Sequence, residues 1–141
     1  CKVDNYPSDI TRTFCLGPSV PAELQKIYDT VLRANEAGRN ISGPGIQMQA
    51  VDRAARSVID AAGYGQYFFH RTGHGLGLEG HEPIPQIAAG VTDILEPGMA
   101  YTIEPGIYIP GFGGVRIEDN VVITDKGVDV LTSFPRTITG K

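Results

Sequence analysis

All three histidines of this chain lie in the segment 70–82, H-R-T-G-H-G-L-G-L-E-G-H-E, which could hold a metal ion or a polar ligand. His70 and His74 are four residues apart, the spacing that places two imidazoles on one helix face in zinc proteases. A helix is unfavourable here, because each interleaved glycine costs roughly 1 kcal/mol relative to alanine in a helix interior. The alternation of glycine with histidine and leucine favours an extended segment that a ligand or another backbone approaches closely. We predict a histidine-lined site, with a glycine-rich turn as the alternative.

Three acidic residues elsewhere occupy positions where a lone carboxylate would be costly to bury. Glu104 ends a predicted apolar strand, and Glu118 lies within another. Asp9 starts a third predicted strand, although a turn aspartate is the simpler interpretation of that position alone. Since a buried carboxylate needs an ion-pair partner or a metal ion, these three residues and His74 form a plausible metal cage.

Such a cage would offer three carboxylates and one imidazole as ligands. Oxygen-rich ligation favours a hard cation such as Mn²⁺, with Co²⁺, Fe²⁺ and Zn²⁺ as alternatives. Bridging carboxylates would suit two ions about 3.5 Å apart that share an activated water. The alternative is that both glutamates form structural ion pairs with Arg116 and Arg12.

Two helices and a set of strands must position these residues, which predicts an α+β fold. Apolar residues at helical spacing predict an amphipathic helix over roughly 21–37, ending near Gly38. After the loop 42–45, a second apolar stripe runs from Val51 to Ala62, and Gly63 ends that helix. We expect both stripes to be core.

The remaining segments are rich in strand-forming residues. Proline and glycine make 83–98 mostly loop. The strands that we predict are a hairpin in 1–16 with its turn at 5–8, a buried strand at 67–69, an extended segment at 74–77, a strand at 99–103 that 107–109 could continue, a strand over 115–124, and a strand at 128–131 after a turn at 125–127.

Composition argues against several functional classes. The 141 residues suffice for one domain with a core, and a net charge of −4 offers no basic surface for nucleic acid or anionic lipid. We expect neither a membrane span nor a signal peptide, since no apolar run approaches ~18 residues. Cys1 and Cys15 are expected to be free thiols, which predicts a cytoplasmic protein.

Four motifs, in the same order, resemble those of the pita-bread metallopeptidases, the family of methionine aminopeptidase, aminopeptidase P and prolidase. They are D-I-T-R-T-F (9–14), the histidine segment extended to Pro83, E-P-G-I-Y (104–108) and V-R-I-E-D-N (115–120), and together they cover nearly the whole chain. The form of the histidine segment and the R-I-E-D ending are most similar to the proline-specific branch. The resemblance implies an incomplete pita-bread fold, a curved antiparallel sheet with two helices on its outer face.

The resemblance also implies roles for the metal ligands. Asp9 would bind or bridge both ions, and His74 would bind one of them. Glu104 would ligate the same ion and stand near the attacking water as its general base. Glu118 would bridge both ions.

Three further residues receive roles around the scissile bond. His81 would contact the substrate or the tetrahedral intermediate, and His70 would shape the pocket for the residue after that bond, usually proline. Arg116 would support the site by pairing with carboxylates or by orienting substrate. The implied activity is a metallo-aminopeptidase or dipeptidase, in which a metal-activated water at two ions, Mn²⁺ in the first instance, cleaves the N-terminal Xaa-Pro bond. The alternatives are a non-catalytic pita-bread binding module and methionine aminopeptidase activity.

The family pattern has a fifth ligand, an aspartate in a D-x-G segment, which would fall ahead of Cys1. We therefore expect residues 1–141 to be the C-terminal part of a pita-bread catalytic domain, with zero or one ion and impaired activity on its own. Half of the sheet would expose an edge that invites pairing. We expect a homodimer, or association with the missing N-terminal part.

Overall fold

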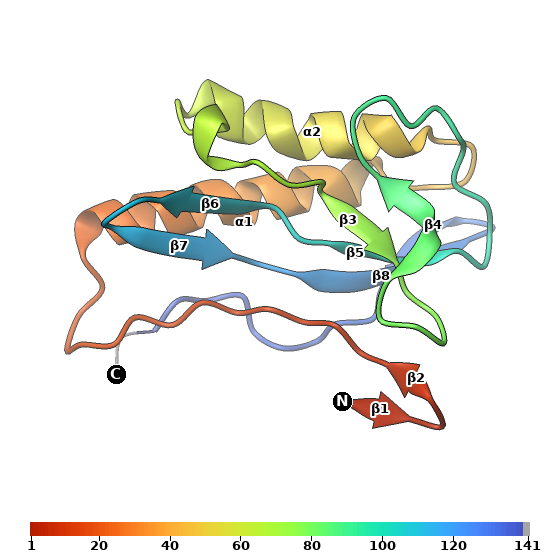
Figure 1. Cartoon of the computed structure of the whole chain (residues 1–141), viewed down its shortest axis with the longest axis horizontal. Coiled ribbons are helices and arrows are strands. Elements are labelled where there is room, and N and C mark those ends of the chain that lie inside the picture. Colours follow the sequence, from red (N-terminus) through yellow and green to blue (C-terminus); the bar gives the residue numbers. More distant parts are fainter. Residues whose placement is uncertain (140–141) are drawn as a thin grey trace.

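The computed structural model describes residues 1–139 and has two layers, a pair of helices and a curved antiparallel sheet (Figure 1). Helices α1 (Ala22–Ile41) and α2 (Met48–Ala61) cover one face of the sheet, and a short 3₁₀ helix, η1 (Gly65–Tyr67), follows them. The strands are β1 (Lys2–Val3), β2 (Tyr6–Pro7), β3 (Gly73–Gly75), β4 (Glu82–Ile87), β5 (Ala100–Ile103), β6 (Gly106–Ile109), β7 (Gly113–Arg116), β8 (Asp119–Thr124) and β9 (Gly127–Val130).

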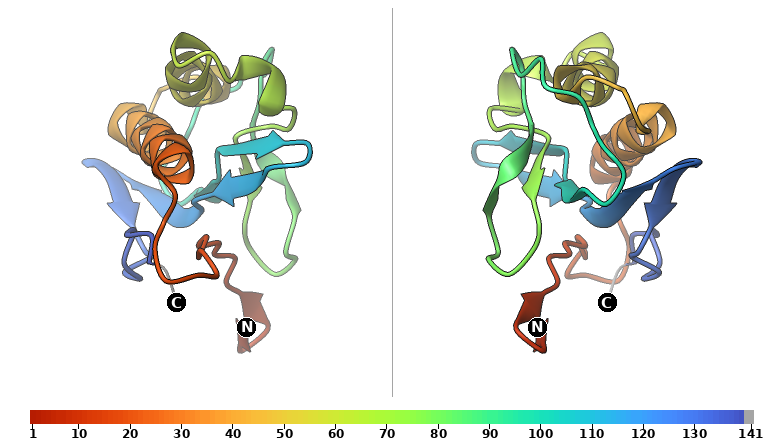
Figure 2. Two further views of the ribbon diagram at one scale, coloured as in Figure 1. Left: turned by 90° about the vertical axis from the view of Figure 1, so that its left-hand side faces the viewer. Right: turned by 90° about the vertical axis from the view of Figure 1, so that its right-hand side faces the viewer.

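The central sheet has the strand order β4-β3-β5-β8-β9, and all its pairs are antiparallel. Strands β6 and β7 form a separate ribbon, and β1 and β2 form a small hairpin that projects from the body (Figure 2). Beyond that hairpin, Thr11 of the N-terminal segment forms an isolated antiparallel bridge with Glu118, which lies between β7 and β8. The predicted α+β fold is confirmed, but the long strand predicted after Asp9 does not form.

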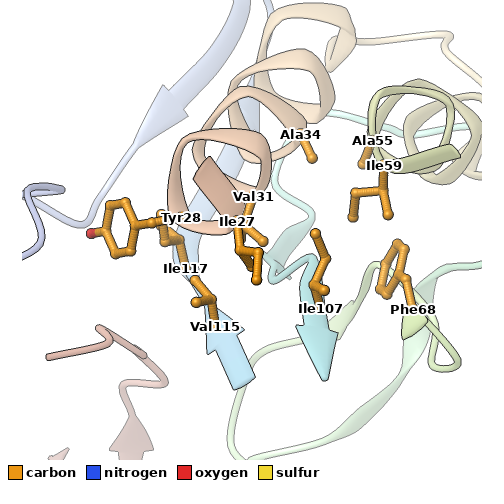
Figure 3. Close-up of a cluster of buried hydrophobic side chains, with 10 residues drawn as sticks. All are labelled: Ile27, Tyr28, Val31, Ala34, Ala55, Ile59, Phe68, Ile107, Val115 and Ile117. Carbon is orange, nitrogen blue, oxygen red and sulfur yellow. The ribbon is translucent and has the colours of Figure 1, made fainter. Parts of the chain in front are cut away.

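The apolar faces of both helices meet the sheet in two clusters of buried side chains. Figure 3 shows the first, in which side chains of α1 and α2 point toward Ile107 of β6 and Val115 of β7. The second joins the start of α2 to β4, β5 and β8. The residues of α2 that lie in these clusters include Val51, Ala55 and Ile59, each with 0% exposure, which confirms the predicted stripe.

Helix α1 continues past Gly38, where the sequence predicted its end. A Cβ on Gly38 would lie 3.1 Å from Ile103 Cγ2, so the missing side chain lets α1 approach β5 closely. The nearby Asn35 Nδ2 donates a hydrogen bond of 2.9 Å to the Ile103 carbonyl. Tertiary packing therefore outweighs the low helix propensity of glycine. By contrast, Gly63 lies just past α2 with a φ of +84°, as predicted for a helix stop.

The predicted strand at 67–69 is wrong. Tyr67 ends η1, Phe68 is buried, and Phe69 is 76% exposed. Phe68 is fixed by Arg56 of α2, whose guanidinium lies 4.1 Å from the ring centroid and donates to the Phe68 carbonyl at 2.8 Å. The aromatic run therefore packs as a turn against α2 rather than as a strand.

The predicted loop 83–98 contains a strand, β4. Pro83 and Pro85 led to the loop prediction, but β4 is the outer strand of the central sheet. Proline is tolerated on an edge strand, because one side of it donates no ladder hydrogen bonds.

Two predicted long strands are interrupted where the candidate ligands lie. After β5, Glu104 and Pro105 separate it from β6, which pairs with β7 instead of continuing the central sheet. Glu118 lies between β7 and β8 rather than inside a strand. The N-terminal turn is also shifted, since Asp4 and Asn5 have φ values of +47° and +71°. Among residues 1–139, neither helix is long and apolar enough to cross a lipid bilayer.

Candidate metal centre

His74 is held at the centre of the site by close contacts of its neighbouring glycines. A Cβ on Gly73 would overlap the Thr102 carbonyl of β5, and a Cβ on Gly75 would overlap the Ile84 carbonyl of β4. Glycine on both sides therefore lets β3 lie tightly between its neighbours. The backbone N–H of His74 donates to Thr102 Oγ1 at 3.1 Å, and the side chain is almost fully buried.

One ring nitrogen of His74 is engaged by the backbone, which leaves the other to face the carboxylates. Nδ1 lies 3.0 Å from the Gly75 carbonyl, which can only accept, so Nδ1 carries the hydrogen. Nε2 faces Glu104 Oε1 at 3.2 Å and Asp9 Oδ2 at 3.7 Å. In the neutral imidazole a lone pair then points at two carboxylates, an arrangement that a cation between them would stabilise. The donor set fits a divalent metal ion.

Glu104 is oriented from both its backbone and its side chain. Its N–H donates to the Thr72 carbonyl at 2.8 Å, and Thr102 Oγ1 donates to its Oε1 at 3.1 Å. Thr102 thus contacts the backbone of His74 and the carboxylate of Glu104 at once. The carboxylate keeps its second oxygen for another partner.

Glu118 is the most deeply buried of the candidate carboxylates, at 2% exposure. Thr11 Oγ1 donates to its Oε2 at 2.5 Å, while Arg116 Nε lies 3.9 Å from the same oxygen. Burial above all, together with the charges of Glu104 and Asp9, raises the pKa of Glu118 to about 7, against the opposing effects of the Thr11 hydrogen bond and Arg116. A bound cation would favour its charged form.

Two groups of side chains in the described residues could hold a metal ion, and they share His74. One is Asp9, His74 and His81, and the other is His74, Glu104 and Glu118, with ligand atoms inside each group lying within 4.8 Å of one another. The four residues that the resemblance implied as ligands are thus brought together. His81, implied as a substrate contact, lies equally near, with its ring centroid 4.0 Å from that of His74.

The alternative of structural ion pairs receives little support for Glu104. Among residues 1–139 its carboxylate makes one ion-pair contact, and that contact is with His74. Arg116 approaches Glu118 only at 3.9 Å, and Arg12 pairs with Asp119 instead of either glutamate.

Arg12 ties the N-terminal segment to the strand that follows Glu118, a role that sequence reasoning did not find. It is almost fully buried, and its Nη2 lies 2.7 Å from Asp119 Oδ1. The only sequence signal was its place inside the motif of Asp9, as Asp119 lies inside the motif of Glu118. Every N–H of its guanidinium donates to an acceptor, namely the carboxylate of Asp119 and the carbonyls of Thr11, Glu118, Phe134 and Pro135.

His70 lies outside both groups but is rigidly placed. Its Nδ1 donates to the Arg71 carbonyl at 2.7 Å, so Nε2 accepts from Tyr108 OH at 3.0 Å. Arg116 Nη1 lies 3.4 Å from the same hydroxyl. The Tyr108 ring covers Gly114, where a Cβ would approach it to 2.7 Å. Tyr108 lies in the E-P-G-I-Y motif, yet the sequence suggested no role for it.

Residues 1–125 match the family model described as metallopeptidase family M24. The chain belongs to this family. Among curated relatives, the Bacillus subtilis protein YkvY is 48% identical over 136 residues, which is 96% of this chain but 37% of the relative. The chain thus spans somewhat over a third of the length of the curated relatives that it matches.

Comparison with solved structures shows that this similarity extends to the fold. A Xaa-Pro dipeptidase from Bacillus anthracis has a TM-score of 0.93 and 47% identity, and the match covers 97% of this chain and 38% of that one. A prolidase from Pyrococcus furiosus has a TM-score of 0.89 and 45% identity, over 94% of this chain and 39% of that one. The expected pita-bread architecture, present in part, is confirmed.

Proposed function

We propose that this chain carries most of the active site of a metallopeptidase that releases the N-terminal residue from Xaa-Pro dipeptides or peptides. One observation carries the proposal: Nε2 of His74 faces the carboxylates of Glu104 and Asp9 at 3.2 and 3.7 Å. Membership of family M24 and the likeness to proteins named Xaa-Pro dipeptidase and prolidase support it. We further propose that residues 1–141 are the C-terminal part of the catalytic domain.

Four residues would hold the metal: Asp9, His74, Glu104 and Glu118. Their oxygen-rich donor set favours Mn²⁺, with Co²⁺, Zn²⁺ or Fe²⁺ as alternatives, and two ions in the whole enzyme. Such ions, when bound, lower the pKa of water and polarise the substrate carbonyl.

The residues of the chain would orient the reactants and move protons around these ions. Glu104 would take the proton of the attacking water on a carboxylate oxygen, while Thr102 fixes the orientation of that carboxylate by its 3.1 Å hydrogen bond. His81 is exposed beside His74 and would donate a hydrogen bond to the substrate at the scissile bond. His70, fixed by Tyr108, would form one wall of the pocket for proline.

Association of the chain is a separate part of the proposal. The N-terminal segment exposes large apolar side chains, including Leu16 at 92% and Val3 at 72%. Covering them would remove apolar surface from water. We propose a homodimer or association with the N-terminal part of the domain.

Cys1 and Cys15 are free thiols, which supports a cytoplasmic location.

Calorimetric titration with Mn²⁺ tests the site directly. We expect the present chain to bind one ion or none, and a version extended to include a D-x-G segment to bind two and to hydrolyse Ala-Pro. In the extended version, Glu118→Gln should abolish binding of the second ion. If neither version binds metal, the metallopeptidase proposal is wrong, and the chain is better regarded as a binding module.

A further inference from the structure

Arg56 of α2 makes contacts that have no part in the proposed chemistry. It lies four residues after Asp52, so the two side chains meet on one face of the helix, with Arg56 Nε 3.2 Å from Asp52 Oδ2. The guanidinium also donates to two backbone carbonyls outside the helix, that of Phe68 at 2.8 Å and that of His70 at 2.9 Å. One side chain therefore fixes the backbone on both sides of Phe69.

The segment that Arg56 holds has no regular secondary structure of its own. Residues 68–72 lie between η1 and β3. Among residues 1–139, the carbonyls of Phe68 and His70 accept no hydrogen bond from a backbone N–H. Since a carbonyl that is removed from water needs a donor, Arg56 supplies to these two residues what a neighbouring strand supplies in a sheet.

Side-chain contacts extend this support from the backbone to the imidazole of His70. The Arg56 guanidinium covers the ring of Phe68, which belongs to the first buried cluster (Figure 3). The ring of Phe68 meets that of His70 edge to face, with centroids 5.0 Å apart. On the other side, His70 Nε2 lies 3.0 Å from Tyr108 OH. The imidazole is thus fixed through its backbone, through the Phe68 ring and through a hydrogen bond.

The Asp52 carboxylate holds the guanidinium in this position. Asp52 is 1% exposed, and its Oδ1 lies 3.1 Å from Arg56 Nη2 and accepts from the Thr72 hydroxyl at 2.7 Å. Because the carboxylate is bound from two sides, it directs the other N–H groups of Arg56 toward the two carbonyls. A planar guanidinium makes all these contacts at once, whereas an ammonium group would keep the charge without the geometry.

We propose that Arg56 is a positioning residue for His70, which it holds in the orientation that binds the substrate residue after the scissile bond. This inference rests on the proposed function, in which His70 forms one wall of the pocket for proline. Within residues 1–139, the hydrogen bonds of Arg56 go to Asp52 and to the two carbonyls, and none goes to a candidate metal ligand. Its loss should therefore alter substrate binding rather than metal binding.

The first test uses the wild-type chain without metal or peptide. The contacts to one carboxylate and two carbonyls should stop rotation about the guanidinium bonds of Arg56, so its Nη protons should give separate signals in NMR spectra. Arg53, at an exposed position of the same helix, should give one averaged signal. An averaged signal for Arg56 would overturn the proposal.

The variant Arg56→Lys, with Arg53→Lys as the matched control, tests whether the contact orients His70. Lysine keeps a positive charge beside Asp52, so the buried carboxylate is not left without a cation. In the wild type at pH 8, the His70 ring should be the single tautomer that its two hydrogen bonds require, with the hydrogen on Nδ1. Arg56→Lys should shift both ring-nitrogen signals toward those of a tautomer mixture, and Arg53→Lys should leave them in place.

The functional consequence is measured in the version extended to include a D-x-G segment. Arg56→Lys should raise the KM for Ala-Pro about tenfold and leave kcat within about twofold, because His70 would bind the substrate in the ground state and the transition state alike. Arg53→Lys should leave both constants unchanged.

The outcomes separate the positioning role from the activity. Unchanged His70 signals in Arg56→Lys would overturn the positioning role and leave the proposed function intact. Shifted His70 signals in a chain whose extended wild type cleaves no Xaa-Pro peptide would refute the proposed function and retain the control of His70 by Arg56. A fall in kcat at unchanged KM would assign Arg56 to another step, against the proposal. If Arg56→Lys does not fold, the signals of Arg56 in the wild type decide.

Discussion

The candidate metal ligands come from two regions that are stabilised very differently. His74, Glu104 and Glu118 lie on or next to strands backed by both helices, and the side chains of His74 and Glu118 are only 3% and 2% exposed. Asp9 lies on the N-terminal segment, and its side chain is 38% exposed. The site therefore combines a rigid part, formed by the helix-backed strands, with the N-terminal segment, which acts as a tether for Asp9. The geometry of the site depends on how firmly this segment is held.

The helix-backed part is fixed by buried polar contacts as well as by its core. Asp52 of α2 accepts hydrogen bonds from the N–H and hydroxyl of Thr72, at 3.2 and 2.7 Å, and pairs with Arg56. Thr72 in turn accepts from the backbone of Glu104. A chain of contacts thus runs from α2 through the residue before β3 to a candidate ligand.

The N-terminal part has few such contacts. Its strands β1 and β2 have two residues each, and Thr11 forms one isolated bridge to Glu118. Arg12 supplies many of the remaining polar contacts, as described above, and Thr11 and Thr13 supply others, to Glu118 and Arg116. We expect changes in the helix-backed part to alter global stability, and changes in the tether to alter the N-terminal segment and metal binding first.

The largest effect is expected for Gly73→Ala. The new Cβ would overlap the Thr102 carbonyl, so β3 and β5 would have to separate. We expect the free energy of unfolding to fall by about 4 kcal/mol, at the upper end for single substitutions. Urea denaturation measures it. Gly80→Ala is the control, because nothing lies within 4 Å of its Cβ, and equal stability of the two variants would contradict the tight packing of β3.

Arg12→Met should weaken the tether. In the variant, Asp119 keeps two ion-pair partners, Arg136 at 2.7 Å and Arg39 at 3.8 Å. The stabilisation of the N-terminal segment is therefore expected to fall by about 3 kcal/mol, at the low end for breaking a buried pair. Hydrogen exchange should accelerate in residues 1–20 and remain slow in β5. Arg53→Met, at an exposed position of α2, is the matched control. Equally faster exchange in both regions would refute the division into two parts.

Glu118 should make the stability of the metal-free chain depend on pH. Its pKa is 4.5 in the unfolded chain and about 7 in the folded one, so the folded state binds more protons between these values. The contribution is fully present below pH 4.5 and is lost as the pH rises through 7, on the order of 2–3 kcal/mol. Denaturation of the wild type and of Glu118→Gln at pH 5 and 8 measures it. A variant with the same loss as the wild type would assign the effect to another group.

The smallest effect on stability is expected for Asp9→Asn. Because the side chain is partly exposed on the tethered segment, the free energy of unfolding should change by less than about 0.5 kcal/mol. In the version extended by a D-x-G segment, the affinity for Mn²⁺ should nevertheless fall more than tenfold, beyond the lower limit for losing a supporting contact of a ligand. Calorimetry compares it with Asp4→Asn in the exposed β1–β2 turn. Equal affinities of the two variants would remove Asp9 from the ligand set.

Local sequence patterns were sufficient to predict the elements whose conformation depends on residues close in the sequence. The apolar stripe of α2, the stop at Gly63 and the turn between β8 and β9 follow from residue spacing and from the preferences of glycine. The metal-site candidates followed from residue chemistry, and their roles from the resemblance to a family. Neither route required knowledge of distances in space.

Tertiary contacts decided the rest. Helix α1 continues through Gly38 because β5 lies against it, and β4 forms despite its prolines because it lies at an edge of the sheet. The approach of His81 to His74 depends on the turn after β3. The bond between Arg12 and Asp119 joins residues 107 positions apart. The spacing of residues along a sequence reports periodicity and local propensity. Contacts between residues distant in the sequence depend instead on how the folded chain brings their segments together in space.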